Sequence, residues 1–168
     1  MSVFIVIPVH NRLEFTRACL ASLGEQTCGD FQIVVIDDGS TDGTHAALAA
    51  EHPDVVVLWG DGDLWWTGAM NKGLAWVLPR AGADDHLLVL NYDTALPPDY
   101  LQTMLDLARS HPRALLGSVA VSEAIADADA DRSSIDATFC ATAYGGVATG
   151  HRVLGALAMT GPPIIDVE

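Results

Sequence analysis

The stretch "IVVIDDGSTDGT", Ile33–Thr44, passes from apolar residues directly into two adjacent acids. Its apolar part does not alternate with polar residues, which is typical of a strand buried on both faces of a parallel sheet. Asp37 and Asp38 then stand at the carboxyl end of that strand, and the small residues after them predict a tight loop. Ligands of open α/β sheets bind at the carboxyl ends of strands. The stretch therefore predicts an α/β fold and the position of a candidate site.

Apolar runs of the same kind recur along the first half of the chain, with helical segments between them. The other runs are "VFIVIPV" (3–9), "VVVLW" (55–59) and "HLLVLN" (86–91). The apolar residues of segments 13–23 and 67–78 each fall on one helical face, with Thr67 as a candidate cap. The Pro97-Pro98 pair suits the first turn of a third helix, which continues to Ala108. This alternation predicts βαβ units and an open, doubly wound, mainly parallel sheet.

The pattern weakens after Val121. The segment 122–136, "SEAIADADADRSSID", is rich in Ala and Asp and predicts a solvated loop or a frayed helix. The segment 137–147, "ATFCATAYGGV", predicts an edge strand. We therefore expect an α/β core over residues 1–121 and a less regular part over residues 122–168.

Composition limits the class of partner. The chain of 168 residues has 22 Asp and Glu against 8 Lys and Arg, for a formal net charge of −14. Such a charge disfavours nucleic acid and anionic lipid headgroups, and it predicts that an anionic ligand is bound with the help of a cation. The sequence has no run of about 18 apolar residues, so we expect no membrane-spanning helix. The apolar residues at its start predict a strand rather than a signal peptide. Three widely spaced cysteines favour free thiols in a reducing cytoplasm over disulfides or a zinc site.

A second acidic strand end follows the fourth apolar run, where Asn91, Tyr92 and Asp93 come after residues 87–90. In an extended chain the side chains of Asn91 and Asp93 point to the same side. Oxygen ligands of this kind suit Mg²⁺ or Mn²⁺, which would also bind phosphate oxygens. The alternative is an ordinary turn, since Asn-x-Asp occurs at many turns.

The first acidic pair also has a structural alternative. Asp37 or Asp38 would then cap the following turn, or a helix that begins near Thr41 and Asp42. This interpretation explains one aspartate better than two, because a second acid at a buried strand end is destabilising unless something pairs with it.

Four motifs resemble those of family 2 glycosyltransferases with a GT-A fold, in the same order and at similar spacing. They are "VIPVHNR" (6–12), "VVIDDGSTDGT" (34–44), "GDLWWTGAMNKGL" (62–74) and "LVLNYDTALPPDYL" (88–101). The resemblance covers about residues 2–116, and the third motif is most similar to a rhamnosyltransferase-like subgroup. It implies a cytoplasmic enzyme of cell-envelope polysaccharide synthesis, peripheral to the inner face of the membrane. The donor would be a UDP- or dTDP-linked sugar, and the acceptor a glycan or a lipid-linked sugar.

The resemblance also implies roles for individual residues. Pro8 and His10 would border the base, Asp38 would hydrogen-bond the nucleoside, and Asp93 with Asn91 would hold the cation that bridges the diphosphate. A carboxylate at Asp38 suits the imide N–H of uracil or thymine, or ribose hydroxyls. Asn91 stands where the family usually has an acid, and this substitution would weaken metal affinity.

The third motif would form the sugar pocket. Trp65 and Trp66 would be its wall, with Gly68 and Asn71 in the first turns of the helix after them and Lys72 near the phosphates. The alternative is that both tryptophans belong to the hydrophobic core. Arg12 or Lys72 would help a bound cation to offset the charge of the diphosphate.

The resemblance implies inverting transfer, in which a carboxylate takes a proton from the acceptor hydroxyl. The remaining candidates for this base are Asp136, Asp166 and Glu168. Because Asp136 follows the predicted loop and the other two lie near the end of the chain, we expect residues 122–168 to be a partial, truncated acceptor side and the chain to transfer sugar poorly. One alternative is a domain that only binds the nucleotide sugar. A receiver-like signalling module is disfavoured, because its acids would follow the first strand, which here ends in "PVHN".

Overall fold

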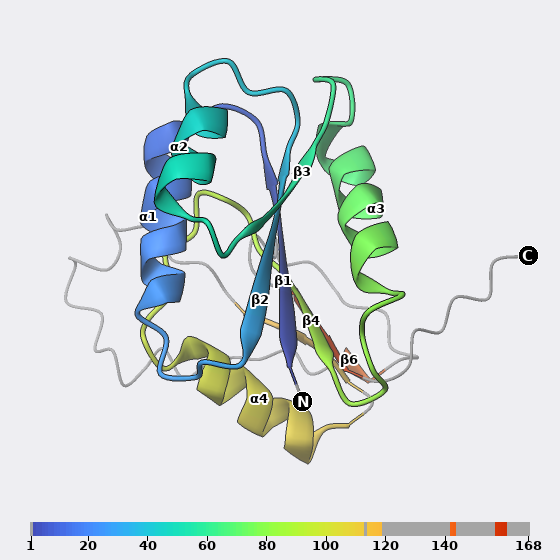
Figure 1. Cartoon of the computed structure of the whole chain (residues 1–168). Helices are drawn as coiled ribbons and strands as arrows, with labels where there is room; N and C mark the ends of the chain where they lie inside the picture. Colours follow the sequence, from blue (N-terminus) through green and yellow to red (C-terminus); the bar gives the residue numbers. More distant parts are fainter. Residues whose placement is uncertain (1, 113, 119–141, 144–156, 161–168) are drawn as a thin grey trace, which may run out of the picture.

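The computed structural model describes residues 2–112, 114–118, 142–143 and 157–160 of the chain. The helices are α1 (Leu13–Gly24), α2 (Thr44–Glu51), α3 (Trp65–Val77) and α4 (Tyr100–Ser110). The strands are β1 (Val3–Val9), β2 (Phe31–Asp37), β3 (Val56–Trp59), β4 (His86–Val89), β5 (Ala114–Gly117), β6 (Thr142–Ala143) and β7 (Leu157–Thr160). They form one sheet in the order β3-β2-β1-β4-β7-β5-β6, with helices on both faces (Figure 1).

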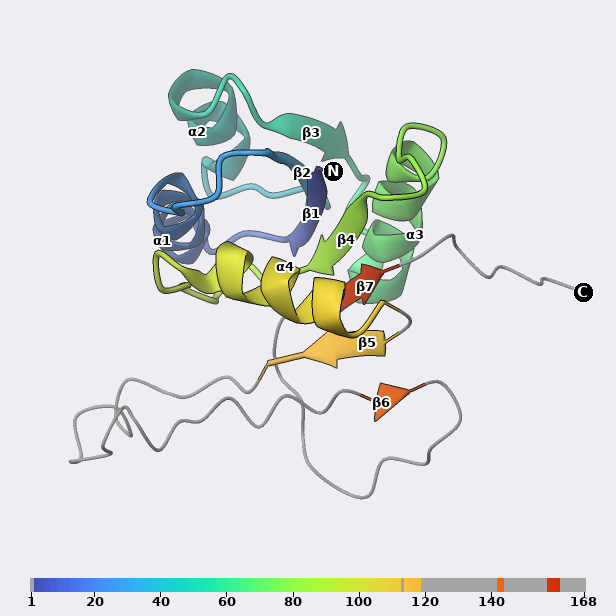
Figure 2. The ribbon, with the colours of Figure 1, turned by 90° about the horizontal axis from the view of Figure 1, so that it is seen from below.

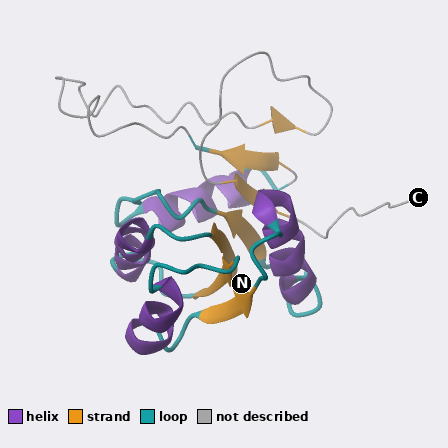
Figure 3. Cartoon of the chain, turned by 90° about the horizontal axis from the view of Figure 1, so that it is seen from above, coloured by secondary structure: helices purple, strands orange, loops and turns teal. Residues whose placement is uncertain are grey.

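The first four strands are parallel and carry the predicted doubly wound topology. Strand β1 pairs with β2 on one side and with β4 on the other, and β3 lies outside β2. The strand order therefore reverses between β1 and β4. Because crossovers between parallel strands are right-handed, this reversal puts α1 and α2 on one face and α3 on the other (Figures 2 and 3). Strands β7, β5 and β6 extend the sheet beyond β4 in antiparallel pairs.

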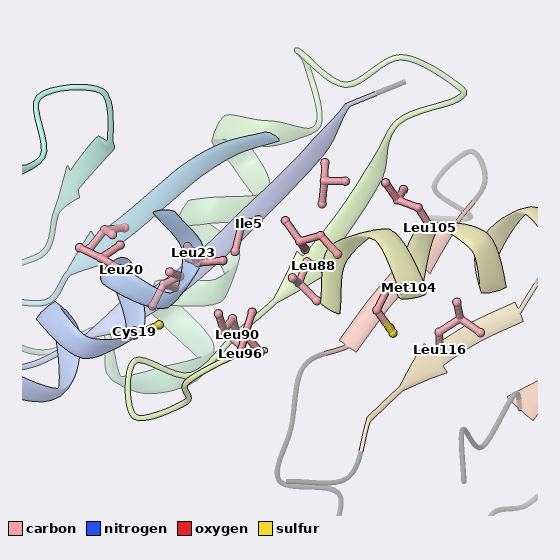
Figure 4. Packing of buried hydrophobic residues seen from close by; sticks show 14 of the residues in the cluster. Ile5, Cys19, Leu20, Leu23, Leu88, Leu90, Leu96, Met104, Leu105 and Leu116 are labelled. Atoms are coloured by element: carbon pink, nitrogen blue, oxygen red, sulfur yellow. The ribbon is translucent and has the colours of Figure 1, made fainter. Parts of the chain in front are cut away.

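The larger core lies on the face covered by α1, α2 and α4. In this cluster, Ile5 of β1 lies with Leu20 and Leu23 of α1 and with Leu88 of β4 and Met104 of α4 (Figure 4). All seven residues of β1 are buried, as the unbroken apolar run predicts for a central strand.

The smaller core lies between the sheet and α3. Phe4, Val6, Val34 and Ile36 of β1 and β2 pack against this helix. A Cβ at Gly73 would lie 2.6 Å from Val6 Cγ1, so α3 lies close to the sheet because this position has no side chain.

The predicted order of strands and helices is confirmed, but three details were wrong. Helix α3 begins at Trp65, so Thr67 lies inside its first turn and is not its cap. Helix α4 begins at Tyr100, after the Pro97-Pro98 pair rather than at it. Strand β3 lies at the sheet edge and is only half-buried, so it is not covered on both faces.

The less regular part is described only in pieces. Strand β6 falls within the predicted edge strand 137–147 and is indeed the outermost strand of the described sheet. The predicted loop 122–136 lies outside the described residues. No described helix is both long and apolar enough to cross a bilayer.

Candidate functional site

A pocket of about 320 Å³ lies where β1, β2 and β4 end and α3 begins. It is therefore at the reversal of strand order, where open α/β sheets bind their ligands. Its lining comprises Pro8, Val9, His10, Asp38, Gly62, Trp65, Trp66, Ala69, Asn91 and Tyr92. Among the residues that the structure describes, the lining contains an acid and aromatic rings but no Lys or Arg.

The loop after β1 carries His10 into this pocket. The Asn11 N–H donates to Ser40 Oγ at 2.7 Å, and Asn11 Oδ1 accepts from the Thr41 N–H at 2.8 Å, which ties this loop to the one after β2. His10 Nδ1 lies 2.5 Å from the Asp38 carbonyl oxygen. Because a carbonyl oxygen only accepts, Nδ1 carries a proton in this contact. In the neutral form of the ring, Nε2 is then an acceptor.

The two adjacent acids have different partners. Asp37 is 1 % exposed, and its Oδ1 accepts the Ser40 N–H at 3.0 Å. Asp37 therefore caps the turn after β2. This is the structural role that the sequence analysis gave as the alternative for one of the two aspartates. The residue does not line the pocket.

Asp38 is 4 % exposed and binds the loop between β3 and α3. Its Oδ1 accepts the N–H groups of Gly62 at 2.9 Å and Leu64 at 3.2 Å, and its Oδ2 accepts that of Trp65 at 3.0 Å. We call this carboxylate and its three N–H donors the Asp38 clamp. A carboxylate has about four acceptor positions, so one of them remains for a ligand.

The two tryptophans are not core residues. Trp65 is 77 % exposed and Trp66 is 56 % exposed, and both line the pocket. Trp65 has φ 53°, in the left-handed region that a bulky residue seldom adopts. The Trp66 indole N–H donates to Asn91 Oδ1 at 3.3 Å, which links the third motif to the fourth.

Asn91, Tyr92 and Asp93 do not continue β4. The strand ends at Val89, and the Thr94 N–H donates to the Asn91 carbonyl at 3.2 Å, so these residues form a turn. The prediction that Asn91 and Asp93 share one side of an extended chain was therefore wrong. Asn91 and Tyr92 line the pocket, whereas Asp93 is exposed beside it.

The carboxylate of Asp93 accepts no hydrogen bond from any described residue. The pKa of the Cys19 thiol on α1 is raised to about 12, mainly by burial and to a smaller extent by the negative charge of Asp93. Cys19 and Cys28 are free, as predicted, and Cys140 lies outside the described residues.

The other predicted site residues lie outside the pocket lining. Gly68 and Asn71 are on α3, and Asn71 is exposed. Lys72 Nζ donates to the Trp59 carbonyl, and Arg12 lies over the Phe15 ring at 5.8 Å. The base candidates Asp136, Asp166 and Glu168 fall outside the described residues.

Sequence reasoning missed Val9, Gly62, Ala69 and Tyr92 among the lining residues. Ala69 lies three and four positions after the two tryptophans, so helical spacing was a usable signal for it. Gly62 has φ 98°, and its N–H donates to Asp38 Oδ1. No local sequence pattern predicts this contact.

The described residues fit a divalent cation only if a ligand supplies most of its coordination. No group of three or more His, Cys, Asp or Glu in the described part of the chain could hold a metal ion. Mg²⁺ and Mn²⁺ are nevertheless commonly held by one or two carboxylates together with substrate phosphates. The exposed, unpaired Asp93 is suited to that mode, and Asn91 Oδ1 keeps a second lone pair after its bond to Trp66.

Comparison with known proteins finds a family and a fold. Residues 4–142 match the family model described as Glycosyl transferase family 2. A PGL/p-HBAD biosynthesis glycosyltransferase of Mycobacterium tuberculosis is 38% identical over 91 residues, which are 49% of this chain and 35% of that protein. An N-acetylglucosaminyl-diphospho-decaprenol L-rhamnosyltransferase of the same species is 34% identical, over 56% of this chain and 33% of that protein. The chain thus spans about a third of the length of these curated relatives.

Two solved structures share the fold. S. aureus TarS 1-349 in complex with UDP-GlcNAc aligns with a TM-score of 0.62 and 19% identity, over 73% of this chain and 36% of that chain. The mannosyltransferase PcManGT from Pyrobaculum calidifontis, in complex with GDP-Man and Mn²⁺, aligns with a TM-score of 0.59 and 23% identity, over 71% and 35%. At these identities the alignments establish the fold alone, which is the predicted GT-A type.

Proposed function

Since the chain belongs to glycosyl transferase family 2, we propose that its pocket binds a nucleoside-diphosphate sugar, with a divalent cation, for transfer of the sugar to an acceptor hydroxyl. The observation that carries this proposal is the place and lining of the pocket. It lies at the reversal of strand order and, among the described residues, offers aromatic rings, one acid and a histidine but no Lys or Arg.

The nucleoside is proposed to lie against Pro8, His10 and Asp38. Histidine Nε2 and the remaining acceptor position of the Asp38 carboxylate both favour a ligand that donates hydrogen bonds. The imide N–H of uracil or thymine is such a donor. Because guanine also has N–H donors, the preference that we expect for UDP- or dTDP-linked sugars over GDP-linked ones rests on the resemblance of the third motif to the rhamnosyltransferase-like subgroup. The sugar is then proposed to lie against Trp66 and Trp65. Gly68, Asn71 and Lys72 are assigned no donor contact.

The diphosphate is proposed to reach the protein through a cation held by Asp93. A protein of net charge −14 repels the diphosphate, and in the described part of the chain no Lys or Arg lines the pocket to offset this repulsion. Bound Mg²⁺ or Mn²⁺ would stabilise the negative charge that develops on the leaving diphosphate. The proposal is supported by the fold shared with a mannosyltransferase whose structure contains GDP-Man and Mn²⁺.

The acceptor side is the second half of the proposal. We propose inverting attack by the hydroxyl of a lipid-linked sugar, with Asp136 or Asp166 as the candidate base. The name of the matched rhamnosyltransferase supports an acceptor of this class, and such an acceptor would bring the protein to the inner face of the membrane. If no base is in place, donor binding would remain without transfer.

Isothermal titration calorimetry with UDP, dTDP and GDP, each with Mn²⁺ and with EDTA, tests the donor site. We expect the two pyrimidine nucleotides to bind more tightly than GDP, and only weakly with EDTA. Equal affinity with Mn²⁺ and with EDTA would contradict the proposal that a metal ion takes part in binding. Tighter binding of GDP would contradict the proposal that the nucleobase is a pyrimidine. Incubation with Mn²⁺, a panel of UDP- and dTDP-sugars and lipid-linked acceptors then tests transfer. Turnover near 1 s⁻¹, within the ordinary range for enzymes, would establish a base.

A further inference from the structure

The Asp38 clamp supplies what the sequence around α3 lacks, namely a cap for the helix. The residue before the helix, Leu64, makes no side-chain cap hydrogen bond. The first N–H groups of a helix need acceptors and favour a negative charge. Asp38 meets both needs from 27 residues earlier in the chain, through the N–H groups of Leu64 and Trp65.

The backbone around the carboxylate is itself held in place. The Asp38 N–H donates to the Val9 carbonyl at 2.8 Å, and the Asp38 carbonyl accepts from His10 Nδ1. The Gly60 N–H donates to the Asp37 carbonyl at 2.7 Å. A Cβ at Gly60 would collide with Asp38 Oδ1, so the loop fits against the carboxylate without spare room.

The clamp fixes the backbone that presents the tryptophan wall. Trp65 donates one of the three N–H groups and has φ 53°, a conformation that persists only where the surroundings impose it. Trp66 follows directly and is held at its other end by Asn91. Both rings project from the start of α3 into the pocket lining.

We propose that Asp38 is a positioning residue that presets Trp65 and Trp66 for the donor. Its carboxylate acts on donor affinity through the two rings, in addition to any contact of its own with the nucleoside. This inference rests on the proposed function in taking the pocket as the donor site.

Hydrogen exchange of individual amides, measured by NMR without ligand, tests the clamp. In the unmodified chain we expect the amides of Gly62, Leu64 and Trp65 to exchange far more slowly than that of exposed Asp61. Asp38→Asn should speed their exchange on the order of 10- to 100-fold, the range for lost bonds to a charged acceptor, while amides of β1 keep their protection.

The matched control is Asp37→Asn, which removes the adjacent buried carboxylate but no bond to this loop. It should leave exchange at Gly62, Leu64 and Trp65 unchanged. Equal exchange of these amides and Asp61 in the unmodified chain would overturn the clamp even if Asp38→Asn does not fold. So would unchanged exchange in a folded Asp38→Asn variant.

A double-mutant cycle tests the action through the rings. With dTDP-rhamnose and Mn²⁺ as the probe, Asp38→Asn should weaken binding on the order of tenfold in the normal background. In a Trp65→Ala/Trp66→Ala background the loss caused by Asp38→Asn should be about threefold smaller, because coupled residues are not additive and only a direct contact of Asp38 with the nucleoside remains to be lost. An equal loss in both backgrounds would overturn the positioning role. If the unmodified chain binds no nucleotide or nucleotide sugar, the proposed function fails. The Asp38 clamp is still tested in that case, because the exchange experiment needs no ligand.

Discussion

Asp93 is the residue whose substitution best separates cation binding from folding. It is exposed, and no described residue donates a hydrogen bond to its carboxylate, so Asp93→Asn removes a charge without breaking a contact. We expect nucleotide affinity with Mn²⁺ to fall to the value measured with EDTA. The free energy of unfolding should change by less than about 0.5 kcal/mol, as for most surface substitutions.

The control for Asp93→Asn is Asp54→Asn, which makes the same change in net charge at another exposed site. This variant should keep the Mn²⁺ dependence measured by calorimetry. If Asp93→Asn also keeps it, the cation is not held by Asp93.

His86 predicts a pH dependence of stability. Both ring nitrogens are buried without a hydrogen-bond partner in the described part of the chain, and burial lowers the pKa of His86. The folded state therefore binds a proton less readily than the unfolded state. The free energy of unfolding should be highest above about pH 6.5, the unfolded pKa, and should fall as the pH drops below it.

Urea unfolding at about pH 7.5 and pH 5.5, on either side of the ordinary histidine pKa, measures this effect. The stability lost between the two conditions should be smaller in His86→Leu than in the unmodified chain. His111→Gln removes an exposed histidine and should not reduce the loss. An identical loss in all three proteins would assign the pH dependence to other groups.

At the scale of elements, the starts of α3 and α4 depend on distant side chains. Asp38 caps α3, and Gln26, which follows α1, accepts the Leu101 N–H of α4 at 2.9 Å through Oε1. Gln26 Nε2 also donates to the Pro97 carbonyl at 2.7 Å. Local patterns predicted both helices but misplaced their first residues, because these caps come from elsewhere in the chain.

Gln26→Ala should therefore destabilise the fold although the side chain lies near the surface. It leaves the Leu101 N–H without its acceptor and removes the amide that donates to the Pro97 and Ser22 carbonyls. We expect a loss of about 1–2 kcal/mol in urea unfolding. The control is Gln102→Ala on α4, whose side chain bonds, within the described part of the chain, only to exposed Asp106. Comparable small losses for both variants would show that α4 is held by packing alone.

At the scale of the whole molecule, the net charge of −14 predicts that the affinity for a nucleoside diphosphate rises with salt concentration. Without a divalent cation, UDP should bind more tightly as NaCl is raised, by roughly two- to fivefold between about 0.01 and 0.15 M, because salt screens the repulsion. Uridine is neutral, so its affinity should change little over the same range. A fall in UDP affinity with salt would indicate instead that Arg12 or Lys72 contacts the phosphates.

The sequence by itself determined the order of strands and helices, the doubly wound sheet and the sheet edge at which the pocket lies. These features follow from apolar periodicity and from acids at strand ends, which are signals between near neighbours along the chain. Only the tertiary structure decided what each polar group does. Asp37 and Asp38 are adjacent, yet one caps its own turn while the other bonds to N–H groups 24 to 27 residues later. Likewise Asn91 meets Trp66 across 25 residues. The reason is physical: a buried polar group must find a partner, and the folded chain rather than the local sequence decides which partner is within reach.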